Sequence, residues 1–323
     1  MSKNSNLINA QIYRQDEFYI TYQEVQDELQ HYSKHFKGKT ILCNCDDPRI
    51  SNFAKYFIEN FNQLGLKRLI CTGYNKQAIM PQMSVWELLE NNPERGYLLD
   101  ITRVPVTSQD FKQLKYNGDF RTKECEQFLD VCDIVVTGPP FSLFREYMRL
   151  LIKHKKQFLI VGSVNAITYR EFFPLLKDNK VWLGYGFQED NAYFFVPDHQ
   201  RIDYAQGVYN SDTGLVKFRN CVWFTTLDHS KRHETLKLTK HFDIEEYPSY
   251  DNYDAIEVSR VADIPKDYDG VMGVPITFLK VYNPDQFRII GLDRYTVPRQ
   301  MLVGGRVALD GQACYARVLI QQR

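Results

Sequence analysis

Residues 132–142 read Cys-Asp-Ile-Val-Val-Thr-Gly-Pro-Pro-Phe-Ser, and this stretch decides the fold class. Its apolar part does not alternate with polar residues, which is typical of a strand buried on both faces of a parallel sheet. The strand must end where Gly138, Pro139 and Pro140 follow. Similar short apolar runs occur at 39–45, 67–72 and 157–161, with helix-like stretches between them. This alternation predicts an α/β protein with a parallel sheet.

The composition is that of a globular protein. The chain has 323 residues, 40 Lys and Arg against 40 Asp and Glu, and 44% hydrophobic residues, enough for one large domain or two. Mean hydropathy is −0.42, and no apolar run approaches the roughly 18 residues of a membrane span. The opening MSKNSNLINAQIY lacks the apolar core of a signal peptide, so we expect a cytoplasmic protein. The seven cysteines show no metal-ligand spacing and are expected to be reduced core residues.

Charge is segregated along the chain although the net charge is zero. Residues 145–180 carry eight Lys or Arg against three acids, 242–270 carry two against nine, and 280–323 carry seven against three. Such segregation suits a polyanion held against one face. Solvated faces of mixed sign explain it equally well, so the charge pattern alone leaves both interpretations open.

Unusual residues follow four of the expected strands, at Asn44–Pro48, Thr72–Asn75, Gly118–Phe120 and Gly138–Phe141. Ligands of open parallel sheets bind at the carboxyl ends of strands, so these clusters are candidate site residues. Taken singly, the first is also explained as a helix cap, and Asp119 as a turn residue. The last cluster is more specific. Two prolines lock the loop, and the aromatic ring of Phe141 offers a flat face on which a planar base can stack.

This loop resembles the Asn/Asp/Ser-Pro-Pro-aromatic loop of S-adenosylmethionine-dependent amino methyltransferases. Longer stretches spread over nearly the whole chain resemble the EcoRI-type adenine-specific DNA methyltransferase family: QDEFYITYQEVQDELQHYSKHFKGKTILCNCDDPRISNFAKYF, NGDFRTKE, DIVVTGPPFSLFREYM, FLIVGSVNAITYREFFPLLK and DYDGVMGVPITFLKVYNPDQF. The resemblance implies a Rossmann-like methyltransferase sheet over residues 1–180. It also implies a mixed target-recognition region over 181–323, whose C-terminal strands complete the core.

The family resemblance implies methylation of adenine N6 in double-stranded DNA, as in restriction-modification systems, with S-adenosylmethionine as the donor. The flipped base would stack on Phe141, and the backbone carbonyl of Pro139 would accept a hydrogen bond from the amino group. The implied catalytic residues are Gly138, Pro139, Pro140 and Phe141. The implied cofactor-binding residues are Asp16, Glu17, Phe18, Tyr19, Asn44, Cys45, Asp46, Asp47, Pro48, Asp119 and Phe120.

The sequence departs from the family at Gly138, where the family carries Asn and thus a second acceptor for the adenine amino group. Three explanations are open: an inactivating substitution made for study, a natural protein that binds DNA without methylating it, or a site with room for a larger donor such as carboxy-S-adenosylmethionine. Methylation of RNA is a weaker alternative, because the Pro-Pro-aromatic loop serves both polymers.

The region after residue 180 is expected to read DNA. Aromatic and basic residues are interleaved there, and Arg219, Lys231 and Arg232 are candidates for contacts with phosphates or guanine. Asn165 follows a strand end and is a candidate for the base pocket, although a helix cap explains it as well. Each arginine and lysine is also explained as a solvated surface residue. No heptad pattern demands a dimer, so the sequence is compatible with a monomer.

Overall fold

The computed structural model describes residues 19–45, 47–75, 95–195 and 207–323, and the chain forms two compact units. The first unit comprises Met1–Val164 and Gly186–Leu227, and the second comprises Asn165–Tyr185 and Asp228–Arg323. Residues 181–323, expected to form the recognition region, are therefore divided between both units. A role of the second unit in target recognition stays a prediction. Within the described ranges, no helix has the length and apolar character needed to cross a membrane.

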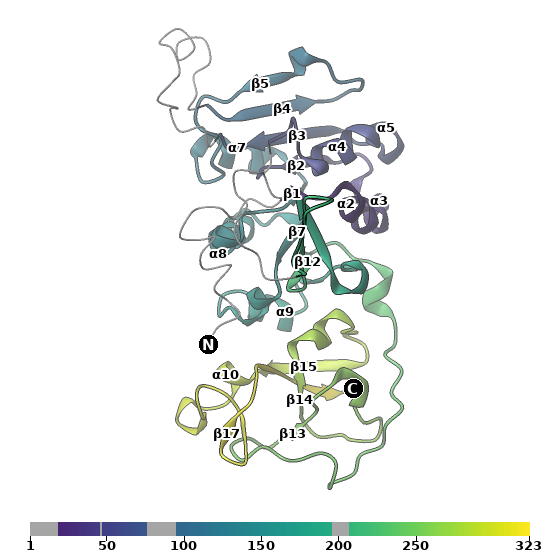
Figure 1. Ribbon diagram of the computed structural model, residues 1–323, viewed down its shortest axis with the longest axis vertical. Helices are drawn as coiled ribbons and strands as arrows, with labels where there is room; N and C mark the ends of the chain where they lie inside the picture. The colour runs from purple at the N-terminus through teal and green to yellow at the C-terminus, as the bar shows by residue number, and fades with distance from the viewer. Residues whose placement is uncertain (1–18, 46, 76–94, 196–206) are drawn as a thin grey trace. The chain divides into compact units, whose positions relative to one another are not determined.

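A large mixed sheet is the centre of the first unit (Figure 1). Its neighbouring strands there are, in spatial order, β5 (Phe111–Gln113), β4 (Tyr97–Ile101), β3 (Arg68–Gly73), β2 (Thr40–Cys43), β6 (Ile134–Thr137), β7 (Gln157–Ser163) and β12 (Cys221–Thr225). The pairs β3–β2, β2–β6 and β6–β7 are parallel, whereas β4, β5 and β12 are added antiparallel. The predicted α/β class with parallel strands is confirmed, and the description as Rossmann-like stays an interpretation.

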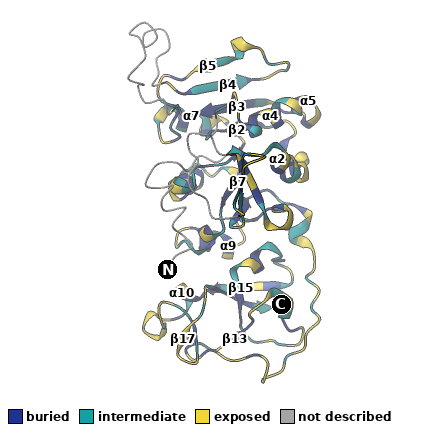
Figure 2. Ribbon diagram, in the orientation of Figure 1, coloured by how far each residue is buried: buried dark blue, intermediate teal, exposed yellow. Residues whose placement is uncertain are grey.

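Helices cover both faces of this sheet. Figure 1 shows α2 (Tyr22–Leu29), α3 (Ser33–Phe36), α4 (Asn52–Glu59) and α5 (Phe61–Leu64) along one side, with α7 (Lys123–Val131) and α8 (Phe144–Lys153) along the other. Thr21, Ser51 and Thr122 accept backbone N–H groups at the starts of α2, α4 and α7, which satisfies donors that a helix leaves unpaired. The helices show dark blue buried and yellow exposed stretches in Figure 2, as amphipathic helices should.

The order of the strands reverses between β2 and β6. The chain leaves β2 through α4 and returns as β3 on one side, and it leaves β6 through α8 and returns as β7 on the other. The two connections therefore diverge at the carboxyl ends of β2 and β6. Such a switch point is where open α/β sheets bind ligands, because the diverging loops leave a crevice between them. Asn44 directly follows β2, and Gly138 directly follows β6.

A small antiparallel sheet completes the first unit. Its order is β1 (Tyr19–Ile20), β9 (Ala192–Phe195), β11 (Leu215–Phe218) and β10 (Tyr209–Asn210). Pairing of β9 with β11 brings the rings of Phe194 and Phe218 to a centroid distance of 5.6 Å. This pairing and that of β12 with β7 explain why residues 186–227 fold with the first unit.

The second unit is built on a sheet of order β13 (Ile256–Glu257), β14 (Met272–Pro275), β18 (Arg317–Gln322) and β15 (Phe287–Leu292). It also contains α9 (Phe173–Lys177), α10 (Asp293–Thr296) and β8 (Trp182–Leu183). Between β15 and β18 lies a short hairpin of β16 (Ala308–Leu309) and β17 (Gln312–Ala313). The buried Glu257 carboxylate accepts bonds from the guanidinium of Arg317, with an Nη2–Oε1 distance of 2.6 Å.

The pH dependence of stability should report on Glu24, a buried carboxyl group of α2. Burial raises its pKa to about 7, against the smaller opposing effect of the hydrogen bond from the Tyr193 N–H. A raised carboxyl pKa means that the unfolded chain ionises first, so stability falls as pH rises from about 4.5 to about 7. We expect Glu24→Gln to raise the free energy of unfolding by about 2 kcal/mol near neutral to mildly alkaline pH, and by little at acidic pH.

Urea unfolding of Glu24→Gln at a series of pH values measures this difference. Glu189→Gln is the control, because Glu189 is an exposed carboxylate of the same unit. A stabilisation by Glu24→Gln that is the same at every pH would contradict the assignment of the pH dependence to Glu24.

Candidate active site

Asn44 occupies the end of β2 and is buried, with 1% of its surface exposed. Its Oδ1 accepts a hydrogen bond from the hydroxyl of Tyr147, which lies on α8 and is fully buried. Burial raises the pKa of Tyr147 well above its ordinary value, so the phenol keeps the proton that it donates. The Nδ2 of Asn44 is also buried and has no hydrogen-bond partner among the described residues. An unpaired buried donor is costly, so this amide is suited to a ligand that accepts its hydrogen bond.

Asp47 shapes the turn that follows Asn44. Its carboxylate accepts bonds from the backbone N–H of Arg49 at 2.9 Å and from the Arg49 Nη2 at 2.6 Å. Its backbone carbonyl accepts the N–H of Ser51 at 2.8 Å, where α4 begins. The Arg49 guanidinium lies 3.5 Å above the centre of the Tyr97 ring. Pro48 is buried in this turn and Cys45 is partly buried.

The Gly118-Asp119-Phe120 turn lies against the end of β3. Gly118 has φ +82°, and a Cβ atom there would lie 2.2 Å from the carbonyl oxygen of Gly73. Only glycine permits both this conformation and this approach. The Phe120 ring packs edge-on against Tyr147, with centroids 5.0 Å apart. Tyr147 therefore contacts both Phe120 and Asn44, and it joins two of the four predicted clusters.

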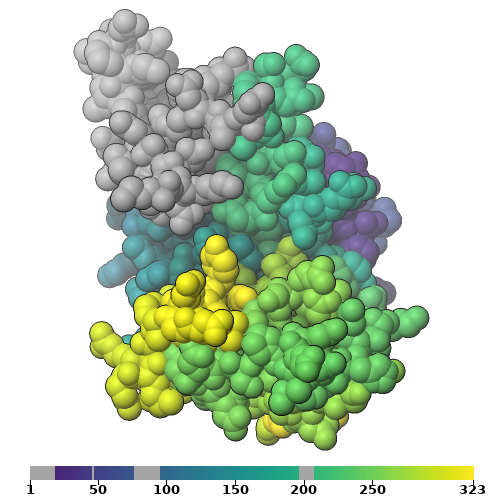
Figure 3. Space-filling model, turned by 60° about the horizontal axis from the view of Figure 1, so that its bottom comes forward, coloured from purple at the N-terminus to yellow at the C-terminus, as the bar shows by residue number. Residues whose placement is uncertain are grey.

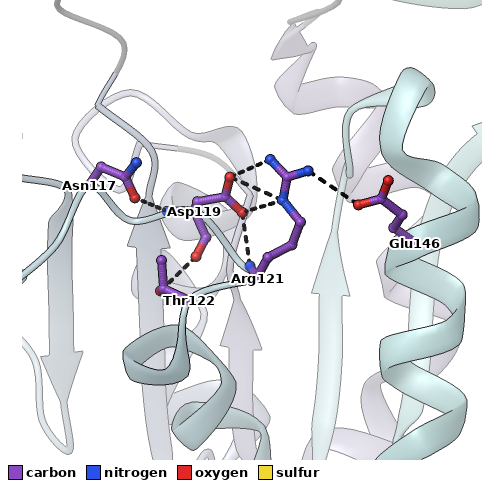
Figure 4. Close-up of polar contacts among 5 residues, drawn as sticks. All are labelled: Asn117, Asp119, Arg121, Thr122 and Glu146. Atoms are coloured by element: carbon purple, nitrogen blue, oxygen red, sulfur yellow. Dashed lines mark hydrogen bonds and ion pairs between the residues drawn. The ribbon is translucent and has the colours of Figure 1, made fainter.

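Asp119 presents a carboxylate in the same turn, and Figure 4 shows Arg121 between it and Glu146 of α8. The Arg121 Nη2 lies 2.6 Å from Asp119 Oδ2, and the Nη1 lies 3.2 Å from Glu146 Oε2. Burial by itself would raise the pKa of Asp119, but the hydrogen bonds and charge of Arg121 outweigh it and lower that pKa. The Asp119 N–H donates to Asn117 Oδ1 at 3.1 Å, which holds the turn. An ionised carboxylate is thus held beside the carboxyl ends of the strands.

The Gly138–Phe141 loop follows β6. A Cβ atom at Gly138 would lie 3.5 Å from Cε2 of Phe53, which is ordinary van der Waals contact, so an added Cβ is accommodated there. The buried Thr137 hydroxyl just before it has no hydrogen-bond partner in the described part of the chain. Pro139 is buried. The Phe141 ring lies edge-on to Phe194 of β9, with a centroid distance of 6.3 Å.

Several predicted cofactor residues are not tested. Asp16, Glu17, Phe18 and Asp46 lie outside the described residues. Tyr19 lies in β1 and pairs with Phe195. The site roles of the residues that are described stay predictions. The structure places Asn44 and Asp47 after β2 and Gly138 after β6 of one sheet. Asp119 and Phe120 lie in the turn that follows β5, which packs against the end of β3.

The four predicted DNA contacts lie in different surroundings. Arg219 is exposed in the first unit, whereas Asn165, Lys231 and Arg232 belong to the second. Only 9% of the Arg232 side chain is exposed, and its guanidinium lies 3.7 Å above the centre of the Trp182 ring. The Lys231 ammonium donates to the Tyr185 carbonyl. Arg232 and Lys231 thus have partners within their own unit, and a contact with DNA stays a prediction for all four.

Sequence reasoning missed Tyr147, Arg49 and Arg121, whose side chains contact the predicted site residues. A signal for Tyr147 was present, because a phenol on an otherwise apolar helix face must find a hydrogen-bond partner when it is buried. The signal for the two arginines was the repeated Asp-x-Arg spacing after two strand ends. In both loops the arginine binds the carboxylate two residues before it with both its backbone N–H and its guanidinium.

The sequence profile of the family described as adenine-specific methyltransferase EcoRI matches residues 6–322. The chain belongs to this family. It is 43% identical to the type II methyltransferase M.EcoRI of Escherichia coli, over 99% of this chain and 97% of that protein. It is 36% identical to the type II methyltransferase M.MgeORF184P of Mycoplasma genitalium, over 86% and 83% of the two chains. The type II methyltransferase M.MpnI of Mycoplasma pneumoniae is 33% identical, over 96% of each chain. No solved structure matches the chain.

Membership in the family confirms the resemblance drawn from the quoted stretches, and the chain is a methyltransferase by family. The Pro-Pro loop follows β6, at the switch point of the sheet. Among the residues that the structure describes, no three His, Cys, Asp or Glu side chains gather as metal ligands would.

The close approach at Gly118 gives a test of the site's construction. Gly118→Ala should cost about 1–2 kcal/mol for the left-handed backbone and more for the contact with Gly73, about 3 kcal/mol or more in all. Gly214→Ala is the matched control, because Gly214 has φ +68° with no atom within 4 Å of the added Cβ. Urea unfolding measures both variants. Equal losses would show that the approach to Gly73 does not constrain the turn.

Proposed function

We propose that this protein transfers a methyl group from S-adenosylmethionine to N6 of adenine in duplex DNA after the base has left the stack. One observation is the main support for this proposal. Two adjacent parallel strands, β2 and β6, are followed by Asn44, whose Nδ2 has no partner in the described residues, and by the Gly138-Pro139-Pro140-Phe141 loop. Leu42 of β2 is paired with Val135 of β6, so the two loops leave the same edge of the sheet. A cofactor held by one loop therefore lies beside a base held by the other.

The residues at this edge fit S-adenosylmethionine. The buried Asn44 Nδ2 is a donor without a partner in the described residues and suits the cofactor's carboxylate. The carboxylates of Asp47 and Asp119 suit its hydroxyl and amino groups, which are donors. When bound, the cofactor supplies a methyl group on a positively charged sulfur. The protein's own task is to hold this group in line with the incoming nitrogen and to exclude water.

The Gly138–Phe141 loop is suited to holding the target base. Adenine N6 cannot be reached inside the duplex, so the base must flip out, and an aromatic ring can then hold it by stacking. Phe141 offers such a ring, and the Pro139 carbonyl can accept one hydrogen of the amino group. Orienting the amino group directs its nitrogen towards the methyl donor. The chain's membership in a family described as adenine-specific supports adenine as the base.

Gly138 leaves the loop with one acceptor fewer than an asparagine would provide. The loss of one hydrogen bond to the amino group should weaken its orientation by about 1–3 kcal/mol. A Cβ atom fits at this position, because the nearest atom to it is Phe53 Cε2 at 3.5 Å. The protein is therefore expected to methylate more slowly than the same chain with Asn at this position.

Gly138→Asn is expected to raise the rate of methylation about tenfold to hundredfold, because it restores an acceptor for the amino group. The measurement is mass spectrometry of nucleosides from duplex DNA incubated with protein and S-adenosylmethionine, repeated with carboxy-S-adenosylmethionine as the donor. Gly138→Ala is the matched control, since it fills the same space without an acceptor. Equal rates for the two variants would contradict a role for the acceptor. If none of the three proteins adds a methyl group to deoxyadenosine, the proposed function is overturned. If the carboxylated donor gives a heavier adduct, that donor replaces S-adenosylmethionine in the proposal.

Tyr147→Phe should lower the affinity for S-adenosylmethionine about tenfold, because the Asn44 amide loses the hydrogen bond that orients it. Isothermal titration calorimetry measures this affinity. Tyr32→Phe is the control, since Tyr32 is also fully buried and donates to Glu28 Oε1 at 2.8 Å within the same unit. A purely structural effect would lower affinity in both variants to the same extent and would contradict a positioning role for Tyr147.

A further inference from the structure

Residues 294–315 of the second unit, here called the C-terminal loop, connect β15 to β18. Asn252 holds its backbone at two points, with Nδ2 donating to the Met301 carbonyl at 2.7 Å and Oδ1 accepting the Ala308 N–H at 3.0 Å. Arg306 within the loop pairs with the fully buried Asp293 at 3.1 Å. Val307 is fully buried in the core cluster of this unit. The loop is therefore anchored at its middle as well as at its ends.

Two tight turns make the C-terminal loop rigid between its anchors. Val303 and Arg306 exchange backbone hydrogen bonds of 3.0 Å around Gly304 and Gly305, both of which have positive φ. Asp310 and Gly311, also with positive φ, connect β16 to β17 in the same way. Two consecutive residues with positive φ are the signature of the hairpin turn that matches the twist of the strands it joins. The backbone of the loop is thus ordered before any partner binds.

The side chains of this rigid loop are mostly directed into solvent. Tyr315 is 86% exposed and Met301 is 46% exposed, and Arg299 and Gln300 are exposed as well. Neither Arg299 nor Gln300 forms a side-chain hydrogen bond or ion pair with any residue in the described ranges. Figure 3 shows the C-terminal part of the chain, in yellow, protruding at the surface beside the green part of the same unit. Exposed apolar side chains on an ordered backbone are typical of an interaction surface.

The charges on the C-terminal loop indicate which kind of partner this surface binds. The loop contains three arginines and one acid, Asp310, and Arg306 is already paired with Asp293. Arg294 and Arg299 form no ion pair with a described carboxylate. In the same unit, residues 242–270 carry nine acids against two basic residues, which repels a polyanion. A polyanion such as DNA therefore complements the C-terminal loop and not the acidic segment.

The residue types on the loop are those that read base edges. Arginine binds guanine, glutamine binds adenine, and apolar side chains contact the methyl group of thymine in the major groove. Building on the proposed function, we propose that the C-terminal loop enters a groove of duplex DNA, with Arg299, Gln300 and Met301 at base edges and Arg294 at a phosphate. This assigns DNA readout to residues other than Arg232, whose guanidinium lies on Trp182.

The test is the affinity of the full-length protein for a fluorescein-labelled duplex of mixed sequence, measured by fluorescence anisotropy at several salt concentrations. The double variant Arg294→Ala/Arg299→Ala should bind about tenfold more weakly or worse. The slope of log affinity against log salt should fall by about one, because Arg294 is assigned to a phosphate and Arg299 to a base edge. Arg260→Ala is the matched control. Arg260 is an exposed arginine of the same unit whose charge is paired with Asp263 at 2.6 Å, so its removal should change neither quantity.

A second measurement addresses base readout. Wild-type protein and Gln300→Ala each select duplexes from a random pool, and Gln300→Ala should lose about tenfold discrimination at one base pair of the selected site. A double variant that binds with the affinity and salt slope of Arg260→Ala, together with unchanged selection by Gln300→Ala, would overturn the inference while leaving the proposed function intact. Wild-type protein that binds RNA or a protein partner but no duplex DNA would overturn both.

Discussion

The parallel pairing of β2 with β6 is the constraint on which the site depends. Ile41 is paired with Ile134, and Leu42 with Val135, although more than ninety positions separate them along the chain. The pairing places the residue after each strand at one edge, and the chain then turns to opposite sides through α4 and α8. A buried polar group at this edge is not covered by a crossing connection. Asn44 can therefore keep a buried Nδ2 that has no hydrogen-bond partner among the described residues.

Tyr147 is the residue that links the strand ends to the helix layer. It lies on α8, contacts Phe120 and donates to Asn44, so the loop after β2, the turn beside β3 and the helix after β6 share one buried side chain. Burial keeps its phenol protonated over the ordinary pH range. The acidic residues nearby are fixed in a similar way by arginines two positions later. Packing and hydrogen bonds together make this edge ordered before a ligand binds, which lowers the cost of binding.

Gly138 bears on the chemistry of the proposed site but not on its fold. The sheet, the Pro-Pro loop and the aromatic ring form with glycine at this position, and an added Cβ would make only ordinary contact there. The fold of a methyltransferase can therefore persist without a side chain at this position. The matched family is described as adenine-specific and the relatives are named as methyltransferases, so neither supports the alternative of a carboxylated donor.

The sequence alone determined the strands of the parallel core, because burial on both faces leaves an uninterrupted apolar run such as Ile134–Thr137. It also located the clusters after those strands, since a chain must place polar or breaking residues where a buried strand ends. Only the tertiary structure decided that β12 joins β7 antiparallel, that Tyr147 meets Asn44, and that Trp182 covers the guanidinium of Arg232. The same holds for the C-terminal loop, whose arginines look no different in sequence from any others. These features are contacts between residues far apart in the sequence. Such contacts are set by the packing of the whole unit and produce no periodic pattern in the sequence.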